Sequence, residues 1–386
     1  MAEYQRVVAE INLDNIAHNL KEVKKRVGED TKVLAVVKAD AYGHGAVEVS
    51  KVVLYNGADW LGVATCEEGV QLRNNSIFVP ILLLGYTPPA RVREVILNNL
   101  TQTVFSYDMA LEFSNEAVRL EKNAHVHIKI DTGMGRIGFM PNEESLREIS
   151  EISKLPNINI TGIYTHFATA DEKDKSFTFE QYKKFTYMAE NTEKIVGRKI
   201  IKHAANSGAI IDLPELKLDM VREGIILYGL YPSLQVQKNI DIRPCMTIRT
   251  NVSYVKDMEE GESIGYGRTF FTKRKSRIAT IPVGYADGYA RAMSNKAFVI
   301  INGKKVPVIG NVCMDQFMAD VTDAGEVKAG DSVILMGEDN GEKISADDIA
   351  EIQKTISYEV LCGIGKRVPR VYIRNGKRLK TVNLIS

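Results

Sequence analysis

The chain has 386 residues, which exceeds what one hydrophobic core usually organises, so two domains are expected. Apolar residues make up 45% of the sequence and charged residues 26%, as in globular proteins. Because 50 Lys and Arg residues nearly balance 49 Asp and Glu residues, the net charge of +1 is too small to recruit nucleic acid or an anionic membrane. A small-molecule partner is favoured.

The four cysteines (Cys66, Cys245, Cys313 and Cys362) are far apart and form no C-x-x-C pair. Their spacing argues against a disulfide framework and against a structural zinc site, and we expect no metal. The amino-terminal MAEYQRVVAEINLDNI carries charges where a signal sequence needs an apolar run. No stretch approaches the roughly 18 apolar residues of a membrane span. We therefore expect a cytoplasmic protein.

Short apolar runs rich in β-branched residues alternate with helical patterns along about the first 230 residues, which predicts βα units and a parallel sheet. Amphipathic segments such as 145–155 and 179–196 are long enough to pack outside a closed sheet. Eight such units predict an α/β fold of the (β/α)8 TIM-barrel type. A doubly wound sheet is the alternative, but no Gly-rich dinucleotide motif follows the first strand. The strand candidates are 33–38, 60–65, 79–85, 102–106, 125–131, 160–166, 199–205 and 219–225.

The pattern changes after Pro232, where strand-like segments are separated by turn-like clusters of Gly, Asn and Asp. This change predicts a second, mostly β domain that contains a late helix at about 345–354. We predict a barrel domain at 1–235 and a carboxy-terminal β domain at 236–386. The first ten residues have strand character and fit either domain. The strand-like segments are 246–255, 276–285, 296–303, 304–312 and 331–337.

Polar residues at the ends of the predicted barrel strands are the candidate site, because catalytic groups of such barrels lie at that face. Lys38 closes the first strand, where the alternative is a lysine that extends to solvent. Tyr42, Gly43 and Gly45 follow it and offer a hydroxyl and flexible backbone. This arrangement suits a phosphorylated aldehyde held by a Schiff base.

An anion site is predicted after strands seven and eight, where such barrels bind phosphate. Ser207 offers a hydroxyl there, and Gly224 and Ile225 offer backbone N–H groups at the start of a helical turn. Taken singly, these are ordinary loop residues. Together with Lys38 they indicate a cofactor that carries both a carbonyl and a phosphate.

The segment VVKADAYGHG (36–45) resembles the cofactor-lysine motif of alanine racemases, and the resemblance covers the whole chain. It implies an amino-terminal barrel, a carboxy-terminal β domain, pyridoxal 5'-phosphate as cofactor and a homodimer whose active sites use both chains. The implied activity interconverts L-alanine and D-alanine and supplies D-alanine for peptidoglycan synthesis. Further matches follow in order: KIDTGMGRIGF (129–139), YTHFATAD (164–171), HAANSGA (203–209), MVREGI (220–225), SIGYGRTF (263–270), PVGYADGY (282–289), GNVCMDQ (310–316) and ISYEVLCGIGKRVPR (356–370).

The resemblance makes Lys38 the Schiff-base lysine and the base for D-alanine, and it makes Tyr266 the base for L-alanine. Racemisation needs two bases because a proton removed from one face of a planar carbanion must return to the other face. Both groups have ordinary pKa values of about 10, so nearby cations must lower them. The implied sources are Arg222, placed against the pyridine nitrogen, and His166 beside it.

The resemblance also makes Arg136 the residue that binds the substrate carboxylate. The charge state of Lys129, a second cation near it, then needs an explanation. HVHIKID alternates polar and apolar residues, so Lys129 should point into the barrel, where an unpaired cation is costly. Many family members carbamylate this lysine with carbon dioxide. The alternative is an ion pair between Lys129 and Asp131 or another carboxylate.

The remaining assignments concern the cofactor phosphate, the substrate pocket and its entrance. Tyr42 and Tyr358 are implied to bind the phosphate, the Met314 backbone to line the pocket, and Tyr285 to line the entrance. Asn311 departs from several relatives, which carry arginine there. His203 and Cys313 are expected to serve packing only.

Three alternatives remain at this point. One is a racemase for another amino acid, such as serine or lysine. A second is a barrel that binds pyridoxal phosphate for storage, although such proteins lack the second domain that carries Tyr266. The third is a decarboxylase of the same fold, which would place an acidic partner near the position of Arg222.

Overall fold

The computed structural model describes residues 6–383, and its contacts divide them into two compact units. The barrel unit comprises residues 15–41 and 45–244. The sheet unit comprises residues 6–14, 42–44 and 245–383. Each unit is described by itself.

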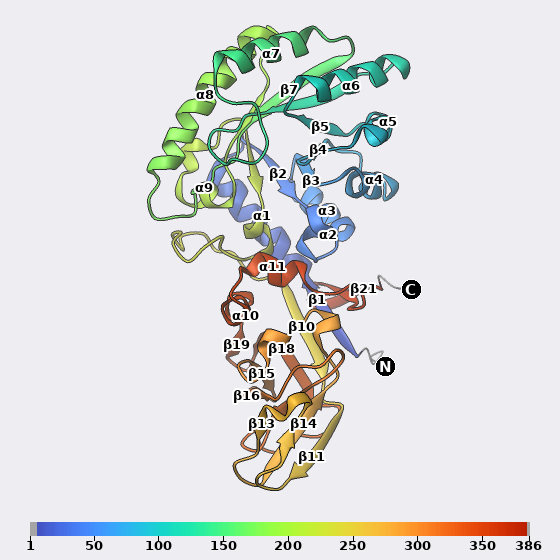
Figure 1. The fold of residues 1–386 in the computed structure, drawn as a ribbon, viewed down its shortest axis with the longest axis vertical. Coiled ribbons are helices and arrows are strands. Elements are labelled where there is room, and N and C mark those ends of the chain that lie inside the picture. Colours follow the sequence, from blue (N-terminus) through green and yellow to red (C-terminus); the bar gives the residue numbers. More distant parts are fainter. Residues whose placement is uncertain (1–5, 384–386) are drawn as a thin grey trace. The chain divides into compact units, whose positions relative to one another are not determined.

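Eight parallel strands close the barrel unit in chain order. Figure 1 shows helices around these strands. The last strand pairs with the first, with Val33 opposite Val221. Most of the strand residues are buried, because side chains fill the interior and helices cover the outside. The predicted TIM barrel is confirmed, and the doubly wound alternative is wrong. The strands are β2 (Lys32–Val36), β3 (Trp60–Val63), β4 (Ile81–Leu83), β5 (Thr101–Val104), β6 (Ala124–Lys129), β7 (Ile158–Tyr164), β8 (Ile201–His203) and β9 (Met220–Glu223).

Several helices of the barrel unit begin at polar caps and bury one face. Thr65 and Glu68 form a capping box, and the Ser106 and Asn142 side chains accept N–H groups of the helices that follow them. The helices are α1 (Leu13–Val27), α2 (Lys38–Tyr42), α3 (Ala46–Tyr55), α4 (Cys66–Asn74), α5 (Val92–Leu97), α6 (Tyr107–Arg119), α7 (Glu143–Lys154), α8 (Ser176–Val196) and α9 (Ser207–Asp212), with short 3-10 turns η1 (Pro89–Arg91), η2 (Pro214–Leu216) and η3 (Ile225–Tyr228).

The sheet unit is mostly β, as predicted, and its main sheet has eleven strands among the described residues. The amino-terminal strand β1 lies in this sheet, antiparallel to β10 and parallel to β20. A boundary between residues 235 and 236 stays a prediction. The elements are β1 (Val7–Asn12), β10 (Met246–Asn251), β11 (Tyr254–Met258), β12 (Ser263–Ile264), η4 (Tyr266–Arg268), β13 (Phe270–Phe271), β14 (Ser276–Ile281), η5 (Tyr285–Asp287), η6 (Arg291–Met293), β15 (Phe298–Ile301), β16 (Lys304–Ile309), β17 (Phe317–Asp320), β18 (Ser332–Asp339), β19 (Glu342–Ile344), α10 (Ala346–Gln353), α11 (Ser357–Cys362), β20 (Arg370–Arg374) and β21 (Lys377–Val382).

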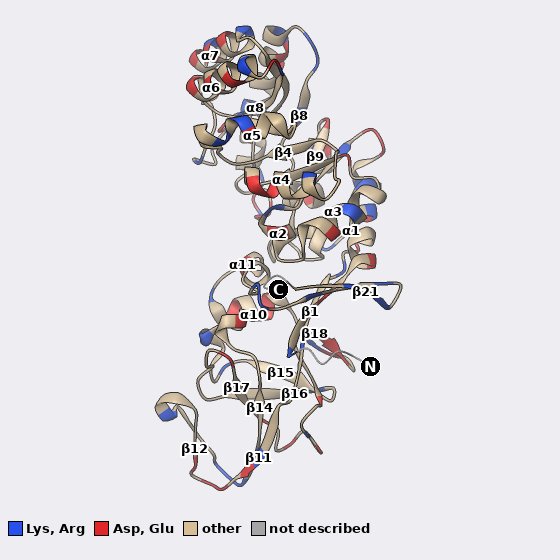
Figure 2. Cartoon of the chain, turned by 90° about the vertical axis from the view of Figure 1, so that its right-hand side faces the viewer, with Lys and Arg blue, Asp and Glu red and all other residues tan. Residues whose placement is uncertain are grey.

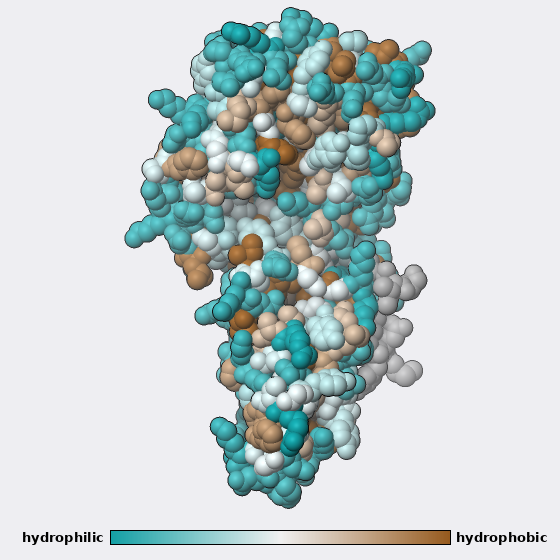
Figure 3. Space-filling view, viewed as in Figure 1, coloured by the Kyte–Doolittle hydropathy of each residue, from teal (hydrophilic) through white to brown (hydrophobic). Residues whose placement is uncertain are grey.

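Charged residues of both signs share the surface, as the near-zero net charge requires. Basic and acidic residues both occur on α6 and α7 in Figure 2. Hydrophilic residues cover most of the face drawn in Figure 3, and apolar residues form small groups on it. No helix among residues 6–383 is both long and apolar enough to cross a membrane.

Candidate active site

Lys38 follows β2 and begins a left-handed helical turn. Ala39, Asp40 and Ala41 have φ of 51°, 52° and 54°, a conformation that costs roughly 1–2 kcal/mol for each L-residue. Two carboxylates hold this turn: Glu68 Oε1 accepts the Ala39 N–H at 2.6 Å, and Asp40 Oδ1 accepts the Ala46 N–H at 2.7 Å. The strained backbone after Lys38 is therefore fixed by hydrogen bonds.

Arg222 is buried and is held by acceptors on β8 and on the loops after β7 and β8. Its Nη1 donates to His203 Nδ1 at 3.0 Å, and its Nη2 lies 2.8–3.1 Å from three acceptors: the carbonyls of Thr165 and Ala204 and the Nδ1 of His166. Burial lowers the pKa of Arg222 to about 10, so the guanidinium stays charged at neutral pH. Its Nε–H and one Nη1–H have no acceptor within residues 6–383. The arginine is a buried donor open to a ligand.

Two buried imidazoles continue from Arg222 in one direction. Because arginine only donates, His203 Nδ1 must accept, and the proton of the neutral ring lies on Nε2. That nitrogen lies 2.9 Å from His127 Nδ1. Burial lowers the pKa of His127 to about 3 and that of His203 well below its usual value, so both rings are neutral at pH 7. His203, expected to serve packing only, is a hydrogen-bond partner of Arg222.

Gly162 on β7 provides the space for the His127 ring. A Cβ at this position would lie 2.5–2.7 Å from three ring atoms of His127. We expect Gly162→Ala to lower the free energy of unfolding by roughly 1–3 kcal/mol, because a packed core gives way only with strain. Urea denaturation measures the loss. The loss should shrink in a His127→Asn background, and an equal loss in both backgrounds would exclude the His127 ring as its cause.

Lys129 is a buried lysine that lies near two other cations, Arg222 and Arg136. Lys129 is buried, donates to the Ile130 carbonyl at 3.1 Å and lies over the Tyr164 ring. Burial, followed by the charge of Arg222, lowers the pKa of Lys129 to about 7. The Asp131 carboxylate instead accepts N–H groups of Gly133, Gly135 and Arg136. Within the described chain Lys129 forms no ion pair, so the alternative of a Lys129–Asp131 pair is not supported.

The predicted anion-binding residues lie together at the ends of β8 and β9. The Gly224 N–H donates to Ser207 Oγ at 3.2 Å, and Ile225 begins η3 directly after Gly224. Charges of Arg222, Lys129, Arg136 and Lys38 all lower the pKa of His166, after burial itself. One barrel mouth therefore gathers the barrel-unit candidates, and four of them are basic.

The remaining candidates belong to the sheet unit. The rings of Tyr42 and Tyr358 lie 6.0 Å apart, and burial raises the pKa of Tyr42. Tyr266 is 72% exposed in η4, and its carbonyl accepts the Asn311 side chain at 2.7 Å. Tyr285 and Met314 lie on adjoining loops, because the Tyr285 N–H donates to the carbonyl of Cys313. Both side chains are exposed.

The barrel mouth fits pyridoxal phosphate by the chemistry of its donors. The open Nε–H of Arg222 suits an aromatic nitrogen that accepts a hydrogen bond. Lys38 supplies an amine for an aldehyde, and the Ser207 and Gly224 region supplies polar groups for a phosphate. Among residues 6–383, no group of three or more His, Cys, Asp or Glu side chains could hold a metal ion.

Comparisons with known proteins agree over nearly the full length. Residues 11–232 match the family model described as alanine racemase, N-terminal domain, and residues 245–372 match alanine racemase, C-terminal domain. The chain belongs to the alanine racemase family. It is 52% identical over 380 residues to an alanine racemase of Clostridium perfringens, which covers 98% of each chain.

Two solved structures are similar in fold. The alanine racemase of Clostridium difficile 630 aligns with a TM-score of 0.95, 45% identity and 99% of each chain covered. The alanine racemase of Bartonella henselae with covalently bound pyridoxal phosphate aligns with a TM-score of 0.85 and 28% identity, covering 96% of this chain and 100% of that one. The 386-residue chain is therefore a pyridoxal phosphate-dependent racemase that interconverts L- and D-alanine. The match of residues 245–372 to the C-terminal domain excludes a barrel that only stores pyridoxal phosphate. Membership of the alanine racemase family excludes a decarboxylase.

Sequence reasoning missed three groups near the site. Nothing in the sequence singled out Glu68, and its pattern marked His127 only as a polar residue in an alternating strand. Glu223 follows Arg222 in MVREGI, and the structure buries it completely. Its two carboxylate oxygens have no partner within the described residues, and burial raises its pKa to about 8.

Glu223 makes stability depend on pH in a predictable direction. Between pH 4.5 and about 8 the folded state keeps the proton while the unfolded state releases it, so the free energy of unfolding falls as pH rises. The slope from one such group is about 1.4 kcal/mol per pH unit. We expect Glu223→Gln to remove this part of the slope, so that the variant is more stable than the native protein at pH 8.

Urea unfolding of the apoprotein between pH 5.5 and 8 measures the difference. Glu144→Gln changes an exposed carboxylate of α7 in the same way and serves as the control. Parallel pH profiles for the native protein and Glu223→Gln would show that Glu223 is ionised in the fold.

Proposed function

We propose that the enzyme racemises alanine with two bases, Lys38 and Tyr266, on opposite faces of the α-carbon. The observation that carries this proposal is Arg222, a buried cation with four neutral acceptors around it and an open Nε–H. Pyridoxal phosphate, when bound, withdraws electrons from the α-carbon. An arginine donor leaves its pyridine nitrogen unprotonated, which limits this withdrawal and suits proton return to the α-carbon only.

Each binding residue has one task. Lys38 holds the aldehyde carbon, Arg222 donates to the pyridine nitrogen, and His166 lies beside Arg222. The phosphate-binding residues are Tyr42, Ser207, Gly224, Ile225 and Tyr358. The phenol oxygen of Tyr266 exchanges the proton of L-alanine, and the amine of Lys38 exchanges that of D-alanine.

The substrate carboxylate is bound by Arg136 and by the Met314 N–H. The Met314 carbonyl already accepts the Ala286 N–H at 3.1 Å, so the Met314 N–H is the backbone group of this residue that remains for a ligand. Tyr285 lines the entrance, where Asn311 replaces the arginine of several relatives.

Lys129 carries a carbamate in this proposal. With a pKa of about 7, its amine is partly neutral at physiological pH and attacks carbon dioxide, forming an N–C bond and releasing one proton. The resulting anion lies among cations and offsets their repulsion. A carbamate signal in the 13C spectrum with labelled bicarbonate, absent from Lys129→Ala, tests this assignment.

The setting follows from the same site. We infer a homodimer with shared active sites in the cytoplasm, supplying D-alanine for peptidoglycan synthesis, with a barrel domain at 1–235 and a β domain at 236–386. Turnover of L-alanine, L-serine and L-lysine in parallel tests the substrate, and alanine should be converted fastest.

Covalent trapping tests Lys38 directly. Borohydride reduction of the native holoenzyme should leave a phosphopyridoxyl group on Lys38 alone, and peptide mass spectrometry locates it. Lys38→Ala should lose both the yellow colour and the trapped group. Lys32→Ala, an exposed lysine at the start of β2, is the control and should retain both. Trapping on another residue in the native protein would refute the assignment.

A further inference from the structure

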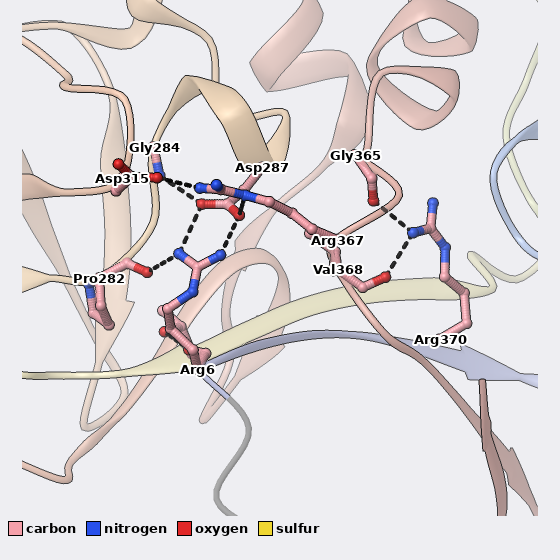
Figure 4. A network of polar contacts seen from close by, with 10 residues as sticks. Arg6, Pro282, Gly284, Asp287, Asp315, Gly365, Arg367, Val368 and Arg370 are labelled. Atoms are coloured by element: carbon pink, nitrogen blue, oxygen red, sulfur yellow. Dashed lines mark hydrogen bonds and ion pairs between the residues drawn. The ribbon is translucent and has the colours of Figure 1, made fainter. Parts of the chain in front are cut away.

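A cluster of four charged side chains includes residues of the loops that carry Met314 and Tyr285 in the sheet unit. Arg6, Asp287, Asp315 and Arg367 form it, and we call it the charge clamp (Figure 4). Asp287 is its centre, because its side chain is 1% exposed and contacts both arginines. Two cations balance two anions, so the cluster carries no net charge.

The Asp287 carboxylate is fully occupied by donors. Arg6 reaches both oxygens, with Nη1 at 2.9 Å from Oδ2, and Arg367 Nε donates to Oδ1 at 2.8 Å. The Gly284 N–H donates to Oδ2 at 3.0 Å. Burial alone would raise the pKa of Asp287, but these donors hold it below its usual value. The carboxylate is therefore ionised and fixes the start of η5.

The turn η5, fixed by Asp287, holds the loop of Met314 through backbone hydrogen bonds. The N–H groups of Tyr285 and Ala286 donate to the carbonyls of Cys313 and Met314, each at 3.1 Å. Gly284 lies so close to this loop that an added Cβ would overlap the Met314 carbonyl. Two carbonyls of the Met314 loop thus depend on the turn that Asp287 fixes.

Arg367 holds the other side of the same loop. Its Nη2 contacts the carboxylate of Asp315, the residue directly after Met314. The Met314 peptide is therefore restrained before, at and after its own position. Within the described residues its N–H has no acceptor, so the restraint leaves one donor open.

We propose that Asp287, held by Arg6 and Arg367, is a positioning residue that fixes the Met314 N–H where it meets the substrate carboxylate. This inference rests on the proposed role of Met314. It assigns no contact between Asp287 and substrate, so the cluster acts on substrate affinity through the backbone. Loss of the cluster should therefore raise KM and weaken the binding of simple carboxylates.

Arg367→Gln is the main test, because it leaves the pair of Arg6 and Asp287 intact. We expect KM for L-alanine to rise roughly tenfold, equivalent to about 1.4 kcal/mol, with kcat changed less than about threefold. Propionate is a carboxylate without an amine, and its Kd for the holoenzyme should rise by a similar factor. Asp287→Asn should show larger changes of the same kind if it folds. Arg274→Gln removes an exposed arginine paired with Asp323 and is the matched control.

Hydrogen exchange of the apoprotein gives a readout that does not need activity. The amides of Tyr285 and Ala286 should exchange faster in Arg367→Gln than in Arg274→Gln. Unchanged exchange overturns the clamp, and faster exchange with unchanged KM and propionate affinity overturns its positioning role. If the native enzyme fails to racemise alanine, the proposed function fails, while exchange and propionate binding still decide this inference.

Discussion

Mixing two inactive variants should restore about a quarter of the native activity. Lys38 belongs to the barrel unit and Tyr266 to the sheet unit, and the proposed dimer draws its two bases from different chains. Lys38→Ala and Tyr266→Phe homodimers then lack one base at every site and should lose activity by about 10²–10⁴-fold. After refolding in equal amounts, about half the dimers are mixed, and each has one intact site of two.

Racemase assays before and after co-refolding measure this recovery. Each variant refolded alone is the control for incomplete inactivation. If both bases of a site come from one chain, every site in the mixture lacks one base and no activity returns. That result would refute the shared site and leave the individual roles of Lys38 and Tyr266 standing.

Arg222→Glu should convert a clean racemase into one with a side reaction. A carboxylate at this position stabilises a proton on the pyridine nitrogen and accepts a hydrogen bond from it, and the protonated ring withdraws electrons more strongly. Racemisation should fall by about 10²-fold or more, because the buried donor is lost. Proton return at the aldehyde carbon should rise, so pyridoxamine phosphate accumulates during turnover with alanine. Chromatography of the released cofactor measures it.

Arg222→Lys is the control for this prediction. Lysine keeps a donor cation without the planar fork that contacts both His203 and His166, so racemisation should fall without the side product. Equal amounts of pyridoxamine phosphate from Arg222→Glu and Arg222→Lys would contradict the proposed contact between the side chain at position 222 and the pyridine nitrogen.

Local pattern was sufficient for the barrel and for most of its candidate residues. The eight predicted runs overlap β2 to β9. Runs such as those of β3 and β4 are apolar because these strands are buried on both faces. Reactive residues such as Lys38 and Ser207 stand out because they follow these runs directly. The roles of Tyr266 and Met314 came from the resemblance, since a tyrosine or methionine in a turn has no chemical signature of its own.

Sequence by itself therefore determined the fold, the family and the residues at the strand ends. Tertiary structure decided what surrounds them: His203 and His127 lie 76 residues apart and form one hydrogen bond, and Asp287 meets Arg6 across 281 residues. Neither contact has a sequence pattern, because each depends on which strands and loops are neighbours in space. The structure likewise places Lys129 beside a carbonyl and a ring, with Asp131 occupied by backbone N–H groups, while its carbamylation stays a prediction. Charge and hydrogen bonding in a buried site are properties of the whole arrangement, so only the assembled fold assigns them.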